Sequence, residues 1–227
     1  MSTGGNVPPS FKVPFQIPDA PERVTLPELT SLATNLLRTC FDAFQRKPGA
    51  YETALSQANW WHFWVVVGAS SLVSAITSAF TLAALEVQFA AAFPGDSVNV
   101  LRPVVGLVIA IPVSFIAFYA GCYASHWWAI TQAGGQAALL QHSYVLTVIW
   151  AAENILAGLV TMALTFIGLS GLGLMLTLAI ALYALFVMAG HIGRLYQFKE
   201  QSRTWVTAGV MVVSSWVVGF VLQALLI

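Results

Sequence analysis

The stretch that decides the fold runs from His126 to Val160 and reads HWWAITQAGGQAALLQHSYVLTVIWAAENILAGLV. One apolar segment ends beyond a tryptophan pair, the chain turns at two glycines, and a second apolar segment follows. The second segment carries Glu153 and Asn154 inside its apolar run. Because about 20 apolar residues are enough to cross a bilayer as a helix, this stretch predicts two membrane spans joined by a tight turn.

The composition of the whole chain is that of a polytopic membrane protein. Of its 227 residues, 58% are hydrophobic and 8% are charged, and the mean hydropathy is +0.79. Soluble domains carry about 25% charged residues, so this chain cannot cover a water-exposed surface. Nine basic residues balance nine acidic ones, which leaves no positive excess to hold a nucleic-acid backbone. We therefore expect the lipid bilayer to be a partner of the chain and nucleic acid not to be one.

Five apolar segments meet the length requirement for a membrane-spanning helix. They cover about residues 60–85, 103–130, 143–167, 172–191 and 204–227. The fold class predicted for residues 50–227 is therefore all-α, a polytopic bundle of five transmembrane helices.

Two segments precede the first span. Residues 1–24 contain five prolines and are expected to be extended. Residues 25–49 are predicted to form an amphipathic helix, because apolar residues recur at helical spacing and Thr25 with Glu28 fits a capping box. Pro48 and the glycine after it are expected to end this helix. The helix is expected to lie in the headgroup plane, and a groove on a partner protein is the alternative.

The distribution of Lys and Arg predicts the orientation of the chain. Five of these residues precede the first span and three lie between the fourth and fifth, whereas Arg102 falls on the opposite side. The positive-inside rule then places the N-terminus in the cytoplasm and the C-terminus outside. Aromatic residues are predicted to form a belt at the cytoplasmic membrane interface, namely Trp60, Trp61, Trp64, Trp127, Trp128, Tyr144, Tyr196 and Trp205.

Glu153 lies about ten residues inside the third span, roughly 15 Å into the bilayer at the helical rise. Hydroxyl groups of other spans are predicted at similar depth, on Ser70, Ser71, Ser74, Tyr119, Tyr183, Ser214 and Ser215. Glu153, with Asn154 beside it, is a candidate for a proton or ion relay or for a small-ligand site. The alternative is a protonated carboxyl that donates to one of these hydroxyls and ties two helices together. We favour the tie, because no second carboxylate and no basic residue shares the layer.

Four histidines lie near the predicted cytoplasmic ends of the spans, at positions 62, 126, 142 and 191. Neutral imidazoles can ligate a metal ion or a haem, so His62, His126 and His191 are the candidates for a cofactor site. No pair of histidines has ligand spacing, and HExxH and CxxCH are absent from the sequence. We therefore expect no metal and no cofactor.

The segment Gly168-Leu-Ser170-Gly171 resembles the GxSG serine motif of rhomboid-type intramembrane proteases. A nucleophilic serine needs a histidine within hydrogen-bond reach. Ser170 is predicted at the outer end of the fourth span and His191 at its inner end, roughly 30 Å away by helical rise. The segment is therefore interpreted as a turn, and we expect no catalytic residues and no enzymatic activity.

Over about residues 40–227 the chain resembles the Yip1-domain family of five-span membrane proteins. The motifs that carry the resemblance are the amphipathic segment ending at Pro48, the Gly134-Gly135 turn followed by Gln141 and Tyr144, and the basic segment Gly190-His-Ile-Gly-Arg194-Leu-Tyr196. The resemblance implies a cytoplasmic N-terminus and a role in membrane organisation or partner scaffolding, with no defined reaction. The acidic, Gly-Pro-containing N-terminal signature of eukaryotic members is absent, which favours a prokaryotic member in the plasma membrane.

The primary functional hypothesis is a non-enzymatic scaffold or partner subunit of a homo- or hetero-oligomeric membrane complex. Its expected contact elements are the residue 25–44 helix, the turn at Gly134 and Gly135, and the loop predicted to carry Arg194 and Tyr196. One alternative is a small transporter or channel that uses Glu153. The other is a cofactor-holding subunit of a bioenergetic membrane complex.

Overall fold

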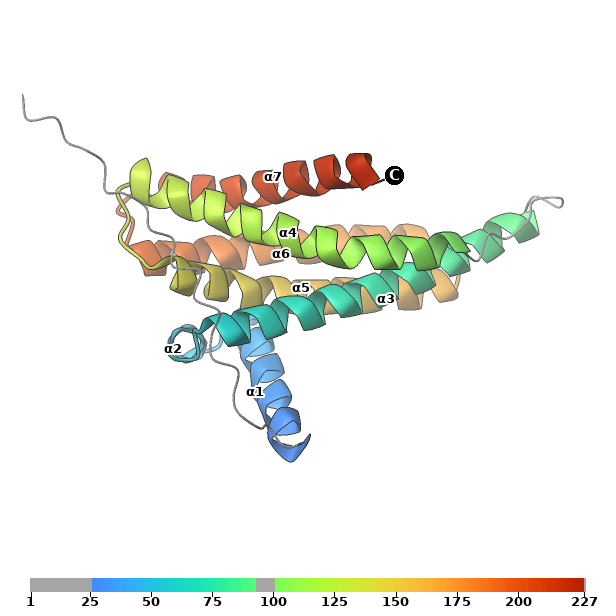
Figure 1. Cartoon of the computed structure of the whole chain (residues 1–227), viewed down its shortest axis with the longest axis horizontal. Helices are drawn as coiled ribbons and strands as arrows, with labels where there is room; N and C mark the ends of the chain where they lie inside the picture. Colours follow the sequence, from blue (N-terminus) through green and yellow to red (C-terminus); the bar gives the residue numbers. More distant parts are fainter. Residues whose placement is uncertain (1–25, 93–100, 227) are drawn as a thin grey trace, which may run out of the picture.

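The computed structural model describes residues 26–92 and 101–226, and within these ranges the chain is helical with no strand (Figure 1). The helices are α1 Leu26–Phe44, α2 Ala50–Ser56, α3 Trp60–Ala92, α4 Leu101–Thr131, α5 Leu139–Phe166, α6 Ser170–Tyr196 and α7 Gln201–Leu226. The predictions for residues 1–24 and for Thr25 as a helix cap lie outside the described residues.

Helices α3 to α7 are each long and apolar enough to cross a membrane. This result confirms the predicted all-α bundle of five transmembrane helices, and the protein is an integral membrane protein. Many large apolar side chains remain exposed on the bundle, for example Leu174, Trp216 and Phe220, each at least 70% exposed. Such a surface is stable in contact with lipid and not with water.

The five long helices alternate in direction. The start of α3, the end of α4, the start of α5, the end of α6 and the start of α7 therefore share one end of the bundle (Figure 1). Helices α1 and α2 lie at this end, which we call the α1 end, and α7 finishes at the opposite end. Helix α5 is central, because it packs against α1, α2, α3, α4 and α6.

Small residues allow the helices to approach closely. A Cβ atom at Gly121 of α4 would lie only 2.6 Å from the Met211 carbonyl oxygen of α7 and would overlap the Ser215 side chain. At Gly158 of α5, a Cβ would overlap Thr77 of α3. Because apolar side chains gain little by leaving lipid for another apolar surface, close packing of this kind is what holds membrane helices together.

The boundaries at the α1 end differ from the sequence predictions. The prediction that Gly190 to Tyr196 forms a basic loop is wrong, because α6 continues to Tyr196 and only residues 197–200 connect it to α7. Buried residues recur at helical spacing through Val187, His191 and Tyr196, so packing favours a helix there. The short helix α2, which begins directly after Gly49, was not predicted.

Helix α1 projects away from the bundle and runs across the direction of the long helices (Figure 1). Its buried face consists of Leu36, Cys40, Ala43 and Phe44, which join the core shared with α5 and α6. Glu28, Thr30, Ser31 and Arg38 are exposed, so α1 is amphipathic, as predicted. The contact face lies in the second half of α1, which leaves the first half beyond the bundle.

Candidate functional site

A cavity of about 430 Å³ lies among the four helices α4, α5, α6 and α7. Its walls are apolar apart from a few side chains. It is lined by Ser114, Ala117, Phe118, Trp150, Glu153, Leu178, Ala181, Leu182, Leu185, Met188, Met211, Val212, Ser215 and Trp216. We call this space the Glu153 cavity. Its volume falls within the roughly 300–1,000 Å³ typical of small-molecule pockets.

Glu153 is the only ionisable residue among those that line the cavity. No side chain or backbone group of the described residues forms a hydrogen bond with its carboxyl group. The Ser215 hydroxyl is buried and also lacks a partner among the described residues. Ser114 donates its hydroxyl to the Ala110 carbonyl oxygen at 2.5 Å, as serines in membrane helices commonly do. The cavity therefore contains two polar groups that the fold leaves unsatisfied.

The cavity opens at the side of the bundle. Three of its lining residues, Leu178 and Leu182 of α6 and Trp216 of α7, are exposed, and Trp216 is 77% exposed. The opening therefore lies between α6 and α7, on a surface that faces lipid in a membrane-embedded bundle. A molecule dissolved in the bilayer can reach Glu153 by this route without crossing water.

The predicted polar tie between helices is made by Asn154 and not by Glu153. The Asn154 side-chain amide donates to the Ser70 hydroxyl of α3 at 3.3 Å. The prediction that Glu153 donates to a neighbouring hydroxyl is wrong in this structure. Successive residues of a helix differ in direction by about 100°, so Glu153 and Asn154 cannot both face α3.

The other hydroxyls of the predicted layer do not gather around Glu153. Tyr119 lies in an aromatic cluster with Trp60 and Trp64. Tyr183 packs edge-on against Phe44 of α1, with ring centroids 5.1 Å apart. Of the layer, only Ser215 lines the same cavity as Glu153. These residues were predicted at a similar depth in the membrane, but their side chains face different parts of the bundle.

A second group of polar side chains is buried at the α1 end. The His126 Nδ1 atom and the Tyr196 hydroxyl are hydrogen bonded at 2.6 Å, and the Ser125 hydroxyl and His142 Nε2 at 2.8 Å. The rings of His126 and His142 lie 5.6 Å apart, and His142 and Tyr196 lie 5.5 Å apart. We call Ser125, His126, His142 and Tyr196 the histidine–tyrosine cluster. Within it, His142 Nδ1 alone is buried without a partner among the described residues.

The Gly134-Gly135 turn is packed against this cluster. Gly134 has a φ of 71°, in the left-handed region that favours glycine. A Cβ atom at Gly135 would overlap the ring of Tyr196, so the turn and the end of α6 are in direct contact. The Arg203 guanidinium of α7 donates to the Ala133 carbonyl oxygen at 2.8 Å.

Of the predicted partner-binding residues, Gly135 and Tyr196 are therefore buried against each other, whereas Gly134 and Arg194 are exposed. Tyr144 and Tyr196, predicted for the aromatic belt, are buried, whereas Trp61, Trp127 and Trp205 are exposed at the α1 end. Burial gives Gly135 and Tyr196 a structural role that requires no partner protein.

The histidines proposed as cofactor ligands do not converge. His62 Nδ1 lies 2.8 Å from both the Asn59 amide and the Gln57 carbonyl oxygen, His126 bonds Tyr196, and His191 Nδ1 bonds the Val187 carbonyl oxygen. Within the described residues no group of three His, Cys, Asp or Glu side chains has the geometry of a metal site. The Nδ1 atom of each of these three histidines is therefore held by a local hydrogen bond.

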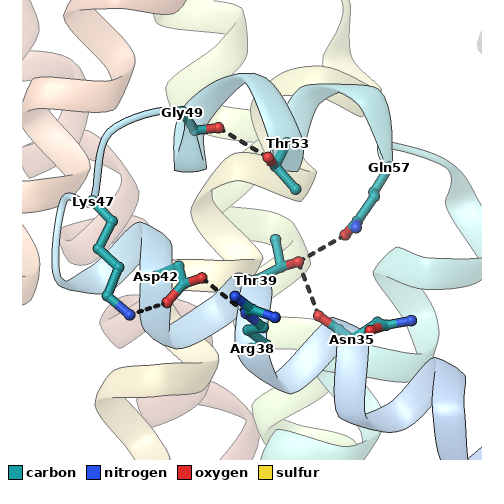
Figure 2. Close-up of polar contacts among 8 residues, drawn as sticks. All are labelled: Asn35, Arg38, Thr39, Asp42, Lys47, Gly49, Thr53 and Gln57. Atoms are coloured by element: carbon teal, nitrogen blue, oxygen red, sulfur yellow. Dashed lines mark hydrogen bonds and ion pairs between the residues drawn. The ribbon is translucent and has the colours of Figure 1, made fainter.

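A polar groove of about 520 Å³ separates α1 from α2 at the exposed corner of the molecule (Figure 2). Asp42 pairs with Lys47 at 2.5 Å and with Arg38 at 3.5 Å. The Thr39 hydroxyl donates to the Asn35 carbonyl oxygen at 2.9 Å and lies 3.0 Å from the Gln57 side-chain oxygen. The Thr39 contact with Gln57 therefore joins α1 to the residue that follows α2.

Two side chains in the second half of α1, Asp42 and Cys40, have pKa values shifted from their ordinary values. The Lys47 ammonium beside Asp42, with a smaller contribution from Arg38, lowers the pKa of the Asp42 carboxyl. Burial raises the pKa of the Cys40 thiol to about 12. Because the thiolate is the reactive form, Cys40 is expected to be inert at neutral pH.

Sequence reasoning missed most of the residues that form the cavity. Ser114, Leu178 and Trp216 come from three helices, and no spacing in the sequence links them to Glu153. Ser215 was included in the predicted polar layer, but nothing in the sequence showed that it shares a cavity with Glu153. The depth of a residue can be counted along a helix, whereas its facing neighbours cannot.

Comparison of the chain with protein-family models, with curated proteins and with solved structures returns no significant match. The similarity to the Yip1-domain family therefore stays a prediction from sequence motifs. Function has to be inferred from the geometry of the described residues.

Proposed function

We propose that the protein binds a small, mostly apolar molecule from within the bilayer, and that Glu153 recognises a protonated amine or another hydrogen-bond donor on it. The observation that carries this proposal is the unpartnered carboxyl group in a ligand-sized cavity. This is the binding step of the transporter alternative, and it involves no chemical reaction. Transport would require the molecule to be released on a different side from the one by which it entered.

The unpartnered carboxyl group of Glu153 has an energetic cost. A buried polar group without a hydrogen bond costs about 1–3 kcal/mol. An ionisable side chain inside a membrane helix is expensive, and such residues usually face a bundle interior and serve a function. A ligand that donates to Glu153 would remove the penalty, and the apolar walls would cover the rest of the molecule.

Glu153→Gln tests this proposal with a matched pair of probes. Trp150 and Trp216 line the cavity, so tryptophan fluorescence reports its occupancy. The full chain in neutral nanodiscs would be titrated with 4-bromobenzylamine, a protonated amine whose bromine quenches tryptophan fluorescence, and with 4-bromobenzoate, an anion of similar shape. We expect quenching by the cation and not by the anion, and on the order of tenfold weaker binding of the cation to the variant.

Asn154→Ala is the control, because it removes the neighbouring polar side chain on a different face of α5. It should weaken the tie to Ser70 and leave probe binding unchanged. Equal quenching by the two probes, or equal binding to wild type and to Glu153→Gln, would contradict the proposal.

A second function, a Yip1-like scaffold or partner subunit in a prokaryotic plasma membrane, is favoured by the arrangement at the α1 end. The first half of α1 projects from the bundle, and Leu37, just after the midpoint of the helix, is 46% exposed (Figure 1). Six Lys and Arg residues lie at the same end: Arg38, Arg46, Lys47, Arg194, Lys199 and Arg203. The positive-inside rule supports a cytoplasmic location for this end and for the projecting half of α1.

The scaffold proposal is tested by extraction in mild detergent and identification of the co-purifying proteins. Leu37→Glu should remove a partner that binds α1, whereas Thr34→Glu, at another exposed position of the same helix, should retain it. A protein that is isolated alone under several mild conditions would contradict this second function.

A further inference from the structure

A small pocket at the α1 end brings together basic side chains from two parts of the chain. It is lined by Arg46, Lys47, Tyr51, Gly190, His191 and Arg194. Arg46 and Lys47 follow α1, Tyr51 belongs to α2, and the other three residues come from the last turns of α6. The cavity volume is about 10 Å³, which is room for about one water-sized group.

Two of the three cations have no carboxylate partner. Among the described residues, Arg46 and Arg194 form no ion pair with Asp or Glu. The Arg46 guanidinium lies 5.0 Å from the centroid of the Phe186 ring, which fixes its position without neutralising it. Lys47 differs, because its ammonium is paired with Asp42 (Figure 2).

Among the described residues, the other carboxylate near the pocket is Glu52, and it leaves the pocket positively charged. Glu52 is exposed and influences the titration of Tyr51 and His191 by charge alone. It forms no ion pair with the arginines of the pocket in this structure. Three cations therefore face this small space, and only one of them is neutralised.

The backbone that presents Arg46 is itself unusual. Arg46 has a φ of 55°, a left-handed conformation in which glycine is the favoured residue at the end of a helix. Its amide donates to the Ala43 carbonyl oxygen at 3.0 Å, and the Lys47 amide donates to the Asp42 carbonyl oxygen at 3.0 Å. These two bonds form a Schellman motif. An arginine where glycine would be less strained points to a use for its side chain.

Tyr51 and His191 complete the wall of the pocket. Their rings pack edge-on with centroids 5.5 Å apart. Burial raises the pKa of the Tyr51 hydroxyl, so this group stays protonated and can donate a hydrogen bond. His191 is buried, and its Nδ1 atom bonds the Val187 carbonyl oxygen, which holds the ring in place.

We propose that the pocket formed by Arg46, Lys47, Tyr51 and Arg194 binds a phosphate group, with an anionic phospholipid of the adjacent leaflet as the favoured source. Planar guanidinium groups bind phosphate oxygens with paired hydrogen bonds. Basic pockets at the ends of membrane helices bind anionic lipid head groups. The pocket admits phosphate oxygens only, so the glycerol and the acyl chains would lie outside it, along α1 and α6.

The test uses the full chain in detergent and native mass spectrometry. Wild type, Arg194→Gln and Lys199→Gln would be incubated with phosphatidylglycerol or with phosphatidylcholine, and the retained lipid would be measured. Lys199 is an exposed cation of the same end, on the connection to α7, and lies outside the pocket. We expect Arg194→Gln to retain on the order of tenfold less phosphatidylglycerol, and Lys199→Gln to behave as wild type.

Inorganic phosphate distinguishes the two sources of the phosphate group. Retention of phosphatidylglycerol that depends on Arg194 and is not displaced by inorganic phosphate assigns the site to lipid. Binding of inorganic phosphate that depends on Arg194, without selective lipid retention, supports a phosphate site for a soluble ligand. Arg46→Gln, checked for helix content by circular dichroism, repeats the test if Arg194→Gln does not fold. Equal retention by wild type and by both arginine variants, with no phosphate binding, overturns the proposal.

Discussion

The histidine–tyrosine cluster and the Glu153 cavity place similar residues in opposite surroundings. Both contain titratable side chains inside membrane-spanning helices. In the cluster, Tyr196 bonds His126, Ser125 bonds His142, and a glycine lies directly beneath the tyrosine ring. In the cavity, Glu153 has no hydrogen-bond partner among the described residues, and about 430 Å³ of space remains beside it.

The presence or absence of a hydrogen-bond partner distinguishes polar residues with a structural role from candidate binding residues. A buried polar group that is paired stabilises the fold, whereas an unpaired one costs free energy until a ligand satisfies it. Substitutions in the cluster should therefore change stability. Substitutions in the cavity should change binding and leave stability nearly unchanged.

Gly135→Ala should have the largest effect on stability. The new Cβ atom would overlap the Tyr196 ring and would lie 3.0 Å from Phe198. The ring cannot move freely, because Tyr196 is buried, bonds His126 and stacks on Phe198. We expect the free energy of unfolding, measured by titration with SDS in mixed micelles, to fall by about 1–3 kcal/mol.

Gly209→Ala is the matched control, because a Cβ atom at this position of α7 has no neighbour within 4 Å. Alanine is the better helix former, so this change should be neutral or stabilising by up to about 1 kcal/mol. Equal losses of stability in the two variants would show that the contact beneath Tyr196 is loose.

Tyr196→Phe and Ser215→Ala compare a paired hydroxyl with an unpaired one. Removal of the Tyr196 hydroxyl leaves the buried His126 without its hydrogen bond, which should cost about 1 kcal/mol. Removal of the Ser215 hydroxyl takes away a buried group that has no partner among the described residues, so stability should stay the same or rise slightly. The same SDS titration measures the free energy of unfolding of both variants. Equal losses would mean that the paired and the unpaired hydroxyl contribute equally to stability.

The sequence predicted the five spans well because each span is a local property. A run of apolar residues has to cross the bilayer as a helix, since no other conformation satisfies its backbone hydrogen bonds in lipid. The extent of α6 was missed, because Arg194 and Gly190 resemble a loop in composition. Burial of Ile192 and Tyr196 against neighbouring helices overrides that local signal.

The candidate site was predicted only in part, for a related physical reason. Counting along the helix predicted a depth for Glu153 but could not show which helix it faces. Its neighbours Leu178, Leu182 and Trp216 are ordinary apolar residues, and only the packing of α6 and α7 brings them to the cavity. The phosphate pocket was missed because Arg46 and Arg194 are almost 150 residues apart in the chain.

Asp42→Asn should have the smallest effect, because its ion pairs lie at the solvent-exposed corner between α1 and α2, outside both regions (Figure 2). Exposed ion pairs contribute little to stability. Lys47 lowers the pKa of Asp42 in the folded protein, so the stabilisation is present above the ordinary value of 3.8.

The stabilisation is lost as the pH falls through the lowered folded value. The difference in unfolding free energy between wild type and Asp42→Asn should therefore be small at pH 6 and vanish in stronger acid. A difference that grows on acidification would contradict the stabilising ion pair between Asp42 and Lys47. A difference as large as that of Gly135→Ala would mean that the corner contributes as much to the fold as the histidine–tyrosine cluster. Paired polar groups outside the membrane-spanning helices would then stabilise the fold as strongly as those inside them.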